Sequence, residues 1–286
     1  KQDPVMTCRQ TCRHTRAAAF AATLLFVTPA VPAFAMAQSL APHRAVYDVA
    51  LEDASDRSGI TAMNGRIVYE FQGSVCDGYT TNFRFVTRIR SASGNRLTDQ
   101  QTSTYEDASG DMFRFLTKSF VDEKLDRELS GTAVHEDEAL IVTLRKPHNE
   151  EIVLEPAMFP SAHMLDLIDR ADSGETFYET KIFDGSEDAD RALTTTVVIG
   201  PEKTELDGDA EAASALADDP YRNVSISYFD EQTEDHAGES LPEYQIAFKL
   251  YDNGVTRDLL MDYGDFSLSG RLARLDMLPR QQCEGE

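Results

Sequence analysis

The sequence predicts a mainly β protein built as a single domain of many antiparallel strands. Most of the chain after residue 37 consists of β-branched and aromatic runs in which apolar and polar positions alternate, the pattern of strands with one buried face. Short turn sequences, such as SGN at 93–95 and DNG at 252–254, separate these runs and favour antiparallel neighbours. Only one segment has clear helical spacing, which disfavours a parallel α/β sheet.

Residues 1–37 differ from the rest of the chain, and we interpret them as an upstream extension followed by a cleaved signal peptide. The stretch KQDPV precedes Met6, where we expect the signal itself to begin. Arginines follow Met6, then the apolar core AAAFAATLLFV at 17–27, two prolines and a series of small residues. We expect cleavage after Ala35 or Ala37. A retained anchor would need about 20 apolar residues, and this stretch is shorter.

From residue 38 to residue 286 we expect one periplasmic β domain with no transmembrane segment. Each predicted strand is a run of β-branched and aromatic residues bounded by turn signals. In chain order, these runs are HRAVYDVALED (43–53), GRIVYEFQG (65–73), TNFRFVTRI (81–89), SGDMFRFLTKSF (109–120), EALIVTLRK (138–146), TFYETKIF (176–183), ALTTTVVIG (192–200), NVSISYFD (223–230), PEYQIAFKLY (242–251) and TRDLLMDYGDFSLSGRLARLDML (256–278).

One segment interrupts the β pattern. PSAHMLDLIDRADSG at 160–174 places four apolar residues at helical spacing behind Ser161, which predicts a short amphipathic helix with Ser161 as its cap. The Ala- and acid-rich stretch 207–219 is a weaker helix candidate or a flexible insertion. Long strands with few helices leave a barrel, a half-barrel or a sandwich, and favour a curved sheet around one core.

The charge of the chain limits its partners. The formal net charge is −23, and residues 1–37 hold more basic than acidic residues, so the remainder is still more acidic. A surface of this average charge repels phosphate backbones and anionic lipid alike. We therefore expect no nucleic-acid partner, and we interpret the acidity as a solvated surface.

The sequence offers no metal or cofactor motif. No G-x-S-x-G elbow and no phosphate-binding glycine loop is present. The histidines after residue 37 lack the H-x-H, H-x-x-H and H-E-x-x-H spacings that bring two ring nitrogens to one metal. These histidines are His43, His135, His148, His163 and His236. We expect no metal and no cofactor.

The many carboxylates of the chain suggest an alternative function, that of an enzyme. An envelope hydrolase acting on lipid or peptidoglycan could use paired acids as general acid and base. Pairs such as Asp137–Glu138 and Asp218–Asp219 occur, but in so acidic a chain they are expected by chance. We therefore assign no catalytic residue and expect that the protein is not an enzyme.

Two cysteines remain after residue 37. A catalytic thiol needs a base or a cation nearby to lower its pKa, whereas Cys76 is followed by Asp77. In an oxidising compartment, Cys76 and Cys283 most simply form one disulfide, which would tie the C-terminal tail to an early turn.

The ordered set of motifs resembles the cell-envelope integrity protein B (EipB) family of alphaproteobacteria, formerly the DUF1849 domain of unknown function. The segments that carry the resemblance are APHRAVYDVAL (41–51), GRIVYEFQGSVCDGYTTNFRFVTRI (65–89), FPSAHMLDLI (159–168), SISYFD (225–230) and PEYQIAFKLYDNGVTRDLLMDYGDFSL (242–268).

The resemblance implies a periplasmic protein with a spiral-like, incompletely closed β-barrel and one or two short helices, reminiscent of periplasmic lipoprotein carriers. It also implies a bridge between the family's two cysteines, at Cys76 and Cys283. The implied role is envelope integrity, with no family catalytic residues to transfer.

We therefore expect a non-enzymatic protein, monomeric, whose curved sheet holds a hydrophobic ligand or engages a periplasmic envelope protein. Some apolar strand positions could line a groove, although most aromatic residues at strand spacing form plain core. These positions are Val68, Phe83, Phe85, Phe113, Phe115 and Phe248.

Overall fold

The computed structural model describes residue 283 and residues 39–281, with the exception of residues 187, 206–210 and 231–240. The chain from Gln38 to Glu286 forms one compact unit. The signal peptide predicted within residues 1–37 lies outside the described residues.

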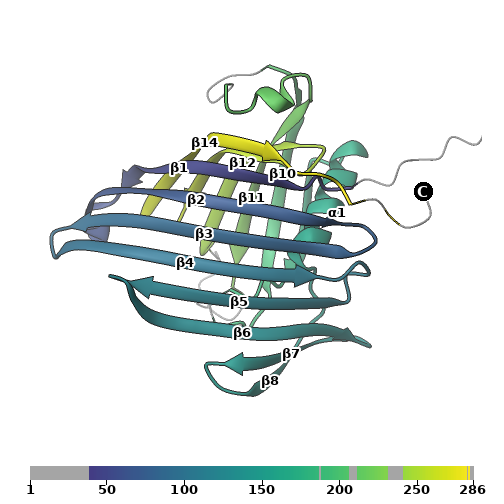
Figure 1. The fold of residues 1–286 in the computed structure, drawn as a ribbon, viewed down its shortest axis with the longest axis horizontal. Helices are drawn as coiled ribbons and strands as arrows, with labels where there is room; N and C mark the ends of the chain where they lie inside the picture. Colours follow the sequence, from purple (N-terminus) through teal and green to yellow (C-terminus); the bar gives the residue numbers. More distant parts are fainter. Residues whose placement is uncertain (1–38, 187, 206–210, 231–240, 282, 284–286) are drawn as a thin grey trace, which may run out of the picture. The chain divides into compact units, whose positions relative to one another are not determined.

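The described residues form one antiparallel sheet of fourteen strands with a single α-helix (Figure 1). The strands are β1 (His43–Ala54), β2 (Ile60–Ser74), β3 (Gly78–Ser91), β4 (Gly94–Glu106), β5 (Met112–Val121), β6 (Lys124–Glu136), β7 (Ala139–Lys146), β8 (Glu150–Leu154), β9 (Phe177–Ile182), β10 (Leu193–Lys203), β11 (Tyr221–Phe229), β12 (Tyr244–Tyr251), β13 (Thr256–Asp262) and β14 (Phe266–Met277). The helix is α1 (Pro160–Asp172), and the short 3-10 turns are η1 (Asp56–Ser58) and η2 (Ser214–Leu216).

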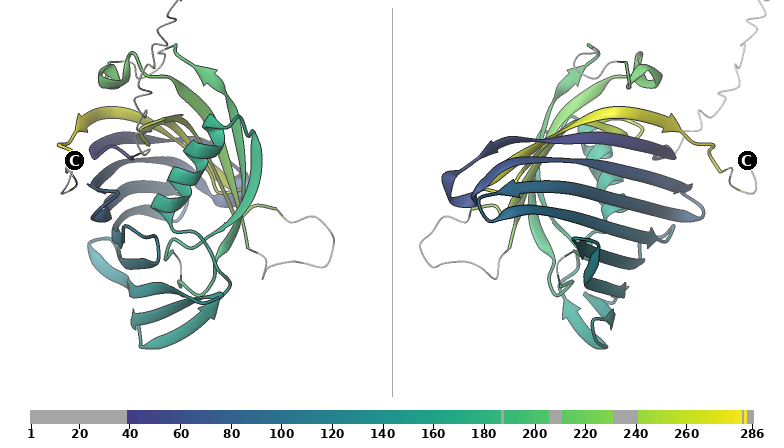
Figure 2. Two further views of the ribbon diagram at one scale, coloured as in Figure 1. Left: turned by 90° about the vertical axis from the view of Figure 1, so that its right-hand side faces the viewer. Right: turned by 60° about the vertical axis from the view of Figure 1, so that its left-hand side comes forward.

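The sheet order places the first and last strands side by side in its interior. The order runs from β8 down to β1, then from β14 down to β9, so β8 and β9 are the two edges. The sheet curls around one core without closing into a barrel, and α1 connects the two edge strands and lies across one end (Figure 2). The predicted mainly β, incompletely closed fold is confirmed.

The segment before α1 partly bridges the gap between the edges. Met158 pairs in parallel with Ile182 of β9, and its amide donates to the carbonyl of Lys181 at 2.8 Å. On the other side, His135 Nε2 of β6 lies 2.9 Å from the carbonyl oxygen of Ala157. This segment therefore supplies some of the backbone pairing that a closed barrel would provide with strands.

The buried apolar residues form three clusters, of which the two larger make up the main core. The larger cluster lies on β1–β3 and β9–β14, and α1 adds Leu167 and Ile168 to it. The smaller one packs β5–β7 against the segments before α1 and after β9, with Phe113 stacked on Phe159 at 5.2 Å between ring centroids. These buried apolar residues account for most of the stability of the fold.

Helix α1 begins one residue before the expected cap. Phe159 occupies the N-cap position and Pro160 is the first helical residue, so the prediction that Ser161 caps the helix was wrong. The carboxylate of Glu106, at the end of β4, instead accepts the backbone N–H groups of Ser161 and Ala162 at 2.8 Å each. Because the acceptor comes from a distant strand, the local sequence gave no sign of it.

Three strands and one turn were not predicted. β4, β6 and β8 lie between the predicted runs, and the run predicted over 256–278 is divided by a turn at 263–265 into β13 and β14. In the stretch 207–219, the described part from residue 211 contains only the short turn η2, and residues 207–210 lie outside the described residues.

Candidate functional site

An apolar hollow opens on the inner face of the sheet, at the strand ends away from α1. Its volume is about 320 Å³, and we call it the inner hollow. Inward-facing residues of β2–β5, β14 and the β13–β14 turn form most of its wall: Met63, Phe85, Thr87, Ile89, Thr98, Gln100, Ser119, Val121, Tyr263, Phe266 and Leu268. The volume falls within the range of about 300–1,000 Å³ typical of small-molecule sites.

A row of aromatic rings continues the rim of the inner hollow. Tyr228 lies 5.3 Å from Tyr244, Tyr244 lies 5.0 Å from Tyr263, and Tyr263 lies 4.9 Å from Phe266 between ring centroids. Burial raises the pKa of the phenols of Tyr228, Tyr244 and Tyr263, so these rings remain uncharged in any physiological buffer. The rim therefore offers apolar ring surface with a few hydroxyl groups.

Four uncharged polar side chains also face the inner hollow: Thr87, Thr98, Gln100 and Ser119. The hydroxyls of Thr87 and Thr98 lie 2.5 Å apart and bond to each other. The carboxylate of Asp99 accepts hydrogen bonds from Arg84 on the other face of the sheet, and this pairing holds the pKa of Asp99 below its usual range. The inner hollow has the chemistry to bind an apolar chain, and this paired carboxylate is a poor general acid.

The six residues that we proposed to line one groove do not lie together in the structure. Phe85 lines the inner hollow, whereas Phe113, Phe115 and Phe248 are buried in the core clusters. Val68 lines a separate hollow on the opposite face of the sheet, whereas Phe83 faces inward and packs against the larger core cluster. The sequence reasoning missed the rim aromatics at Tyr263 and Phe266. Both lie in the run predicted as one strand, and the Asp-Tyr-Gly-Asp sequence there was the available sign of a turn.

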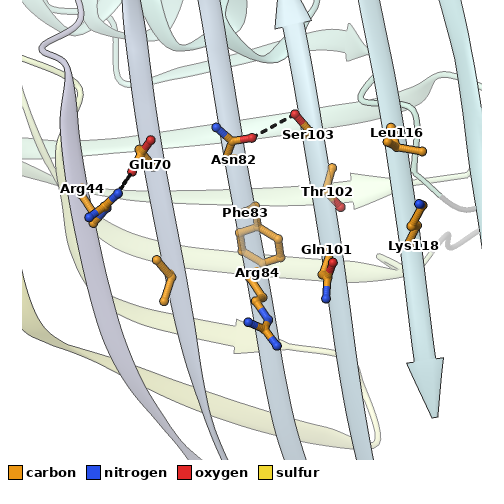
Figure 3. Close-up of a pocket in the computed structure, with 11 residues that line it drawn as sticks. Arg44, Glu70, Asn82, Phe83, Arg84, Gln101, Thr102, Ser103, Leu116 and Lys118 are labelled. Atoms are coloured by element: carbon orange, nitrogen blue, oxygen red, sulfur yellow. Dashed lines mark hydrogen bonds and ion pairs between the residues drawn. The ribbon is translucent and has the colours of Figure 1, made fainter. Parts of the chain in front are cut away.

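A second, shallow hollow of about 600 Å³ lies on the opposite face of β1–β5, and we call it the outer hollow. The strand register aligns Arg44, Glu70, Asn82, Ser103 and Leu116 across these strands. Figure 3 shows the ion pair between Arg44 and Glu70, and the hydrogen bond of 2.9 Å between Ser103 and Asn82. Arg44, Glu70, Arg84 and Lys118 line the outer hollow, which therefore holds more charged side chains than the inner hollow.

The described histidines lie apart from one another. His43 and His163 are buried, and burial lowers the pKa of both, to about 4 for His163, whose Nε2 lies 3.2 Å from the hydroxyl of Tyr178. His148 is exposed beside Glu150. Within the described ranges, no group of three or more His, Cys, Asp or Glu side chains could hold a metal ion. His236 lies outside those ranges.

Cys76 and Cys283 form a disulfide, with their Cα atoms 5.9 Å apart. Cys76 lies in the turn between β2 and β3, where Ser74 Oγ donates to the carboxylate of Asp77 at 3.0 Å. Gly78 opens β3 with a φ of +79°, and a Cβ there would lie 2.3 Å from the carbonyl oxygen of Glu106. The bridge therefore fastens the tail after β14 to a turn whose geometry requires glycine.

Among the helices of the described chain, none has the length and apolar character needed to span a bilayer.

A single antiparallel sheet curled around an apolar hollow, with a helix across one end, defines a mainly β, barrel-like protein. The chain belongs to the EipB-like family, whose model matches residues 34–279. It is 48% identical over 244 residues to the cell envelope integrity protein EipB of Brucella abortus (strain 2308), a match that covers 85% of this chain and 86% of the relative.

The fold is also that of a solved structure. The crystal structure of a beta-barrel-like protein of domain of unknown function DUF1849 from Brucella abortus matches with a TM-score of 0.81 and 48% identity. The match covers 85% of this chain and 100% of that chain. Neither relative is named as an enzyme.

Proposed function

We propose that this protein is a periplasmic, non-enzymatic monomer that maintains cell-envelope integrity by holding a hydrophobic ligand, such as an acyl chain, in the inner hollow. The observation that carries the proposal is the inner hollow itself, in which inward-facing apolar side chains outnumber the uncharged polar ones and aromatic rings form the border. The name of the Brucella abortus relative supports the envelope role.

Native mass spectrometry of protein purified from its own periplasm tests this proposal. We expect lipid-sized adducts on the wild type. Ser119→Phe should fill the inner hollow, and Ile89→Glu should place a charge in it, so both should lose the adducts. Val86→Glu is the matched control, because Val86 lies on the same strand as Ile89 but faces the opposite side of the sheet.

Two results would contradict ligand binding. The first is wild-type protein that carries no adduct although it is isolated under native conditions. The second is an adduct retained equally by Ser119→Phe, Ile89→Glu and Val86→Glu, which would place the bound molecule elsewhere. Circular dichroism and melting curves establish whether each variant remains folded.

One observation favours a second candidate, a periplasmic protein partner that adds a strand to the sheet. β8 pairs with β7 along one edge, and no described strand pairs with its other edge. An open edge is a template for strand addition by an extended peptide. Cross-linking mass spectrometry in intact cells tests this candidate, since β8 should cross-link to another protein; cross-links that join only copies of this chain would argue against it.

A further inference from the structure

The outer face of β1–β7, the face turned away from the core, departs from the acidic character of the chain. The strand register identifies its residues, because alternate residues on paired strands share one face. Its basic residues are Arg44, Arg66, Arg84, Arg88, Arg90, Arg114, Lys118 and Arg145, its acidic residues are Asp48, Asp53, Glu70, Asp99, Glu128 and Glu136, and Glu151 lies beside it on β8.

Ion pairs neutralise most of the acids on this face. Arg44 pairs with Glu70, Arg66 with Asp48 at 2.6 Å, Arg84 with Asp99 at 2.8 Å and Lys118 with Glu128 at 3.8 Å. Within the described ranges, Arg88, Arg114 and Arg145 have no carboxylate within 4.0 Å, although all three are exposed. Over β3–β7, where six of these basic residues and three of these acidic residues lie, the surface therefore keeps a net positive charge.

Arg114 and Arg145 border a shallow depression of about 490 Å³, which Met112, Thr132 and Thr143 also line. Arg114 lies opposite Thr132, and Thr132 lies opposite Thr143, so two threonine hydroxyls fall in a row beside the guanidinium groups. Guanidinium groups bind phosphate through paired N–H donors, and hydroxyl groups can donate to the remaining oxygens.

The acid on the neighbouring strand does not occupy this depression. Glu151 lies opposite Thr143 but makes no ion pair with Arg114 or Arg145 within 4.0 Å. The guanidinium carbon of Arg114 lies 5.9 Å from the centroid of the Tyr105 ring, a cation–π contact that leaves its N–H groups available.

Exposed aliphatic side chains accompany these arginines. Leu116 of β5 is 37% exposed and Val153 of β8 is 65% exposed, and the register places both on the same outer face. Leu125 at the start of β6 is 53% exposed. Unpaired arginines interspersed with aliphatic side chains match the chemistry of a bilayer interface, where phosphate groups border the acyl region.

We propose that the outer face of β3–β7, centred on Arg114 and Arg145, docks on a membrane surface that carries anionic phospholipid headgroups. This proposal differs from the expectation, based on average charge, that the protein repels anionic lipid. Charges act locally, because the Debye length is about 8 Å at physiological ionic strength. The cations on this face therefore dominate at contact, while the acidic surfaces elsewhere favour an orientation that presents this face.

Co-sedimentation with lipid vesicles tests the proposal. We expect the purified protein to bind vesicles of phosphatidylcholine mixed with phosphatidylglycerol, to bind pure phosphatidylcholine weakly, and to dissociate at high salt. Each basic residue near an anionic surface contributes about 1 kcal/mol, so the double variant Arg114→Gln/Arg145→Gln should bind at least tenfold more weakly. The double variant Arg114→Lys/Arg145→Lys should retain most of the binding.

The matched control is Lys203→Gln/Arg280→Gln, which removes the same charge from exposed positions outside β3–β7 and should bind like the wild type. Ile89→Glu faces the inner hollow and should also bind normally, so failure of ligand binding and failure of docking are distinguishable. Absence of wild-type binding to the anionic vesicles would overturn the proposal. Equal losses in the two charge variants would also overturn it, because net charge alone would then explain binding.

Discussion

Glu106 connects a strand end to the helix that lies across the sheet. Its carboxylate accepts the backbone N–H groups of Ser161 and Ala162, which the helix itself cannot satisfy. Burial raises the pKa of this carboxyl, while the two backbone hydrogen bonds oppose that rise. Burial also raises the pKa of the Tyr69 phenol, to about 12, and the negative charge of Glu106 adds to this rise. One acid thus fixes where α1 begins.

Replacement of Glu106 should therefore loosen α1. We expect Glu106→Ala to lower the free energy of unfolding by about 1–2 kcal/mol, because the buried N–H of Ser161 and the part-buried N–H of Ala162 lose their acceptor while the cost of burying a charge is relieved. Glu106→Gln, which keeps one acceptor oxygen, should lose less. Urea denaturation measures both values against Glu52→Ala, an exposed carboxylate on β1. Equal stability of Glu106→Ala and Glu52→Ala would contradict the capping role.

His163 should make the stability of the protein depend on pH. Burial lowers its pKa from 6.5 to about 4, so the unfolded chain takes up a proton at a higher pH than the folded chain does. The uncharged form of His163 therefore makes its full contribution to the free energy of unfolding above about pH 6.5, and this contribution decreases as the pH falls toward 4. The linkage between protonation of His163 and folding therefore predicts that the free energy of unfolding is about 2 kcal/mol lower at pH 5 than at neutral pH.

Denaturation curves at pH 7 and pH 5 measure this dependence. His163→Gln should have a shallower loss of stability between these pH values than the wild type, whereas His148→Gln, at an exposed position, should match the wild type. His43 is also buried and remains in both variants, so part of the loss should persist. A wild-type slope in His163→Gln would show that His163 is not the group responsible.

At the scale of elements, the disulfide joins the β2–β3 turn to the tail after β14. The sequence separation of 207 residues corresponds to about 5 kcal/mol at most in the chain-entropy model, before any strain. Cys76→Ser and Cys283→Ser should therefore lower the melting temperature under oxidising conditions and increase proteolysis near the C-terminus. Reductant should bring the wild type to the level of the variants; equal melting temperatures in oxidant would argue against a stabilising role.

Two of the missed strands lack an apolar face that the sequence could reveal. β4 carries polar residues on both faces, because it faces the inner hollow on one side and the outer hollow on the other. The buried positions of β6 are Leu129, Gly131 and Ala133, and two of these residues are too small to mark an apolar face. Strand patterns are recognisable where one face is buried, as in β1, in which buried and more exposed positions alternate. β4 lacks that alternation, and its pairing with β3 and β5 specifies it instead.

At the scale of the whole molecule, chain topology explains why the site could not be read from the sequence. β1 pairs with β14, so residues from both ends of the domain meet in the interior of the sheet. The inner hollow consequently combines Met63 and Phe85 with Tyr263 and Phe266. Local composition was enough to predict the β class and the disulfide. Which distant strands lie side by side depends on their pairing and register, and composition does not determine these.

This convergence leads to a prediction about ligand-linked stability. A ligand in the inner hollow contacts β2–β5 and the β13–β14 region together, and an unfolded chain cannot offer that surface. A saturating ligand should therefore raise the free energy of unfolding by about 2.7 kcal/mol at a concentration one hundred times its Kd. Differential scanning calorimetry with a single-chain fatty acid as the probe should show a higher melting temperature, and hydrogen exchange should slow in both groups of strands.

Ser119→Phe separates ligand binding from a general detergent effect. Its side chain fills the inner hollow, so the variant should melt at one temperature with or without the fatty acid, while Val86→Glu should keep the wild-type shift. If the fatty acid instead raised the melting temperature of Ser119→Phe as much as that of the wild type, it would be acting at another surface. Protection confined to β2–β5 would likewise show that the β13–β14 region does not contribute to one continuous site.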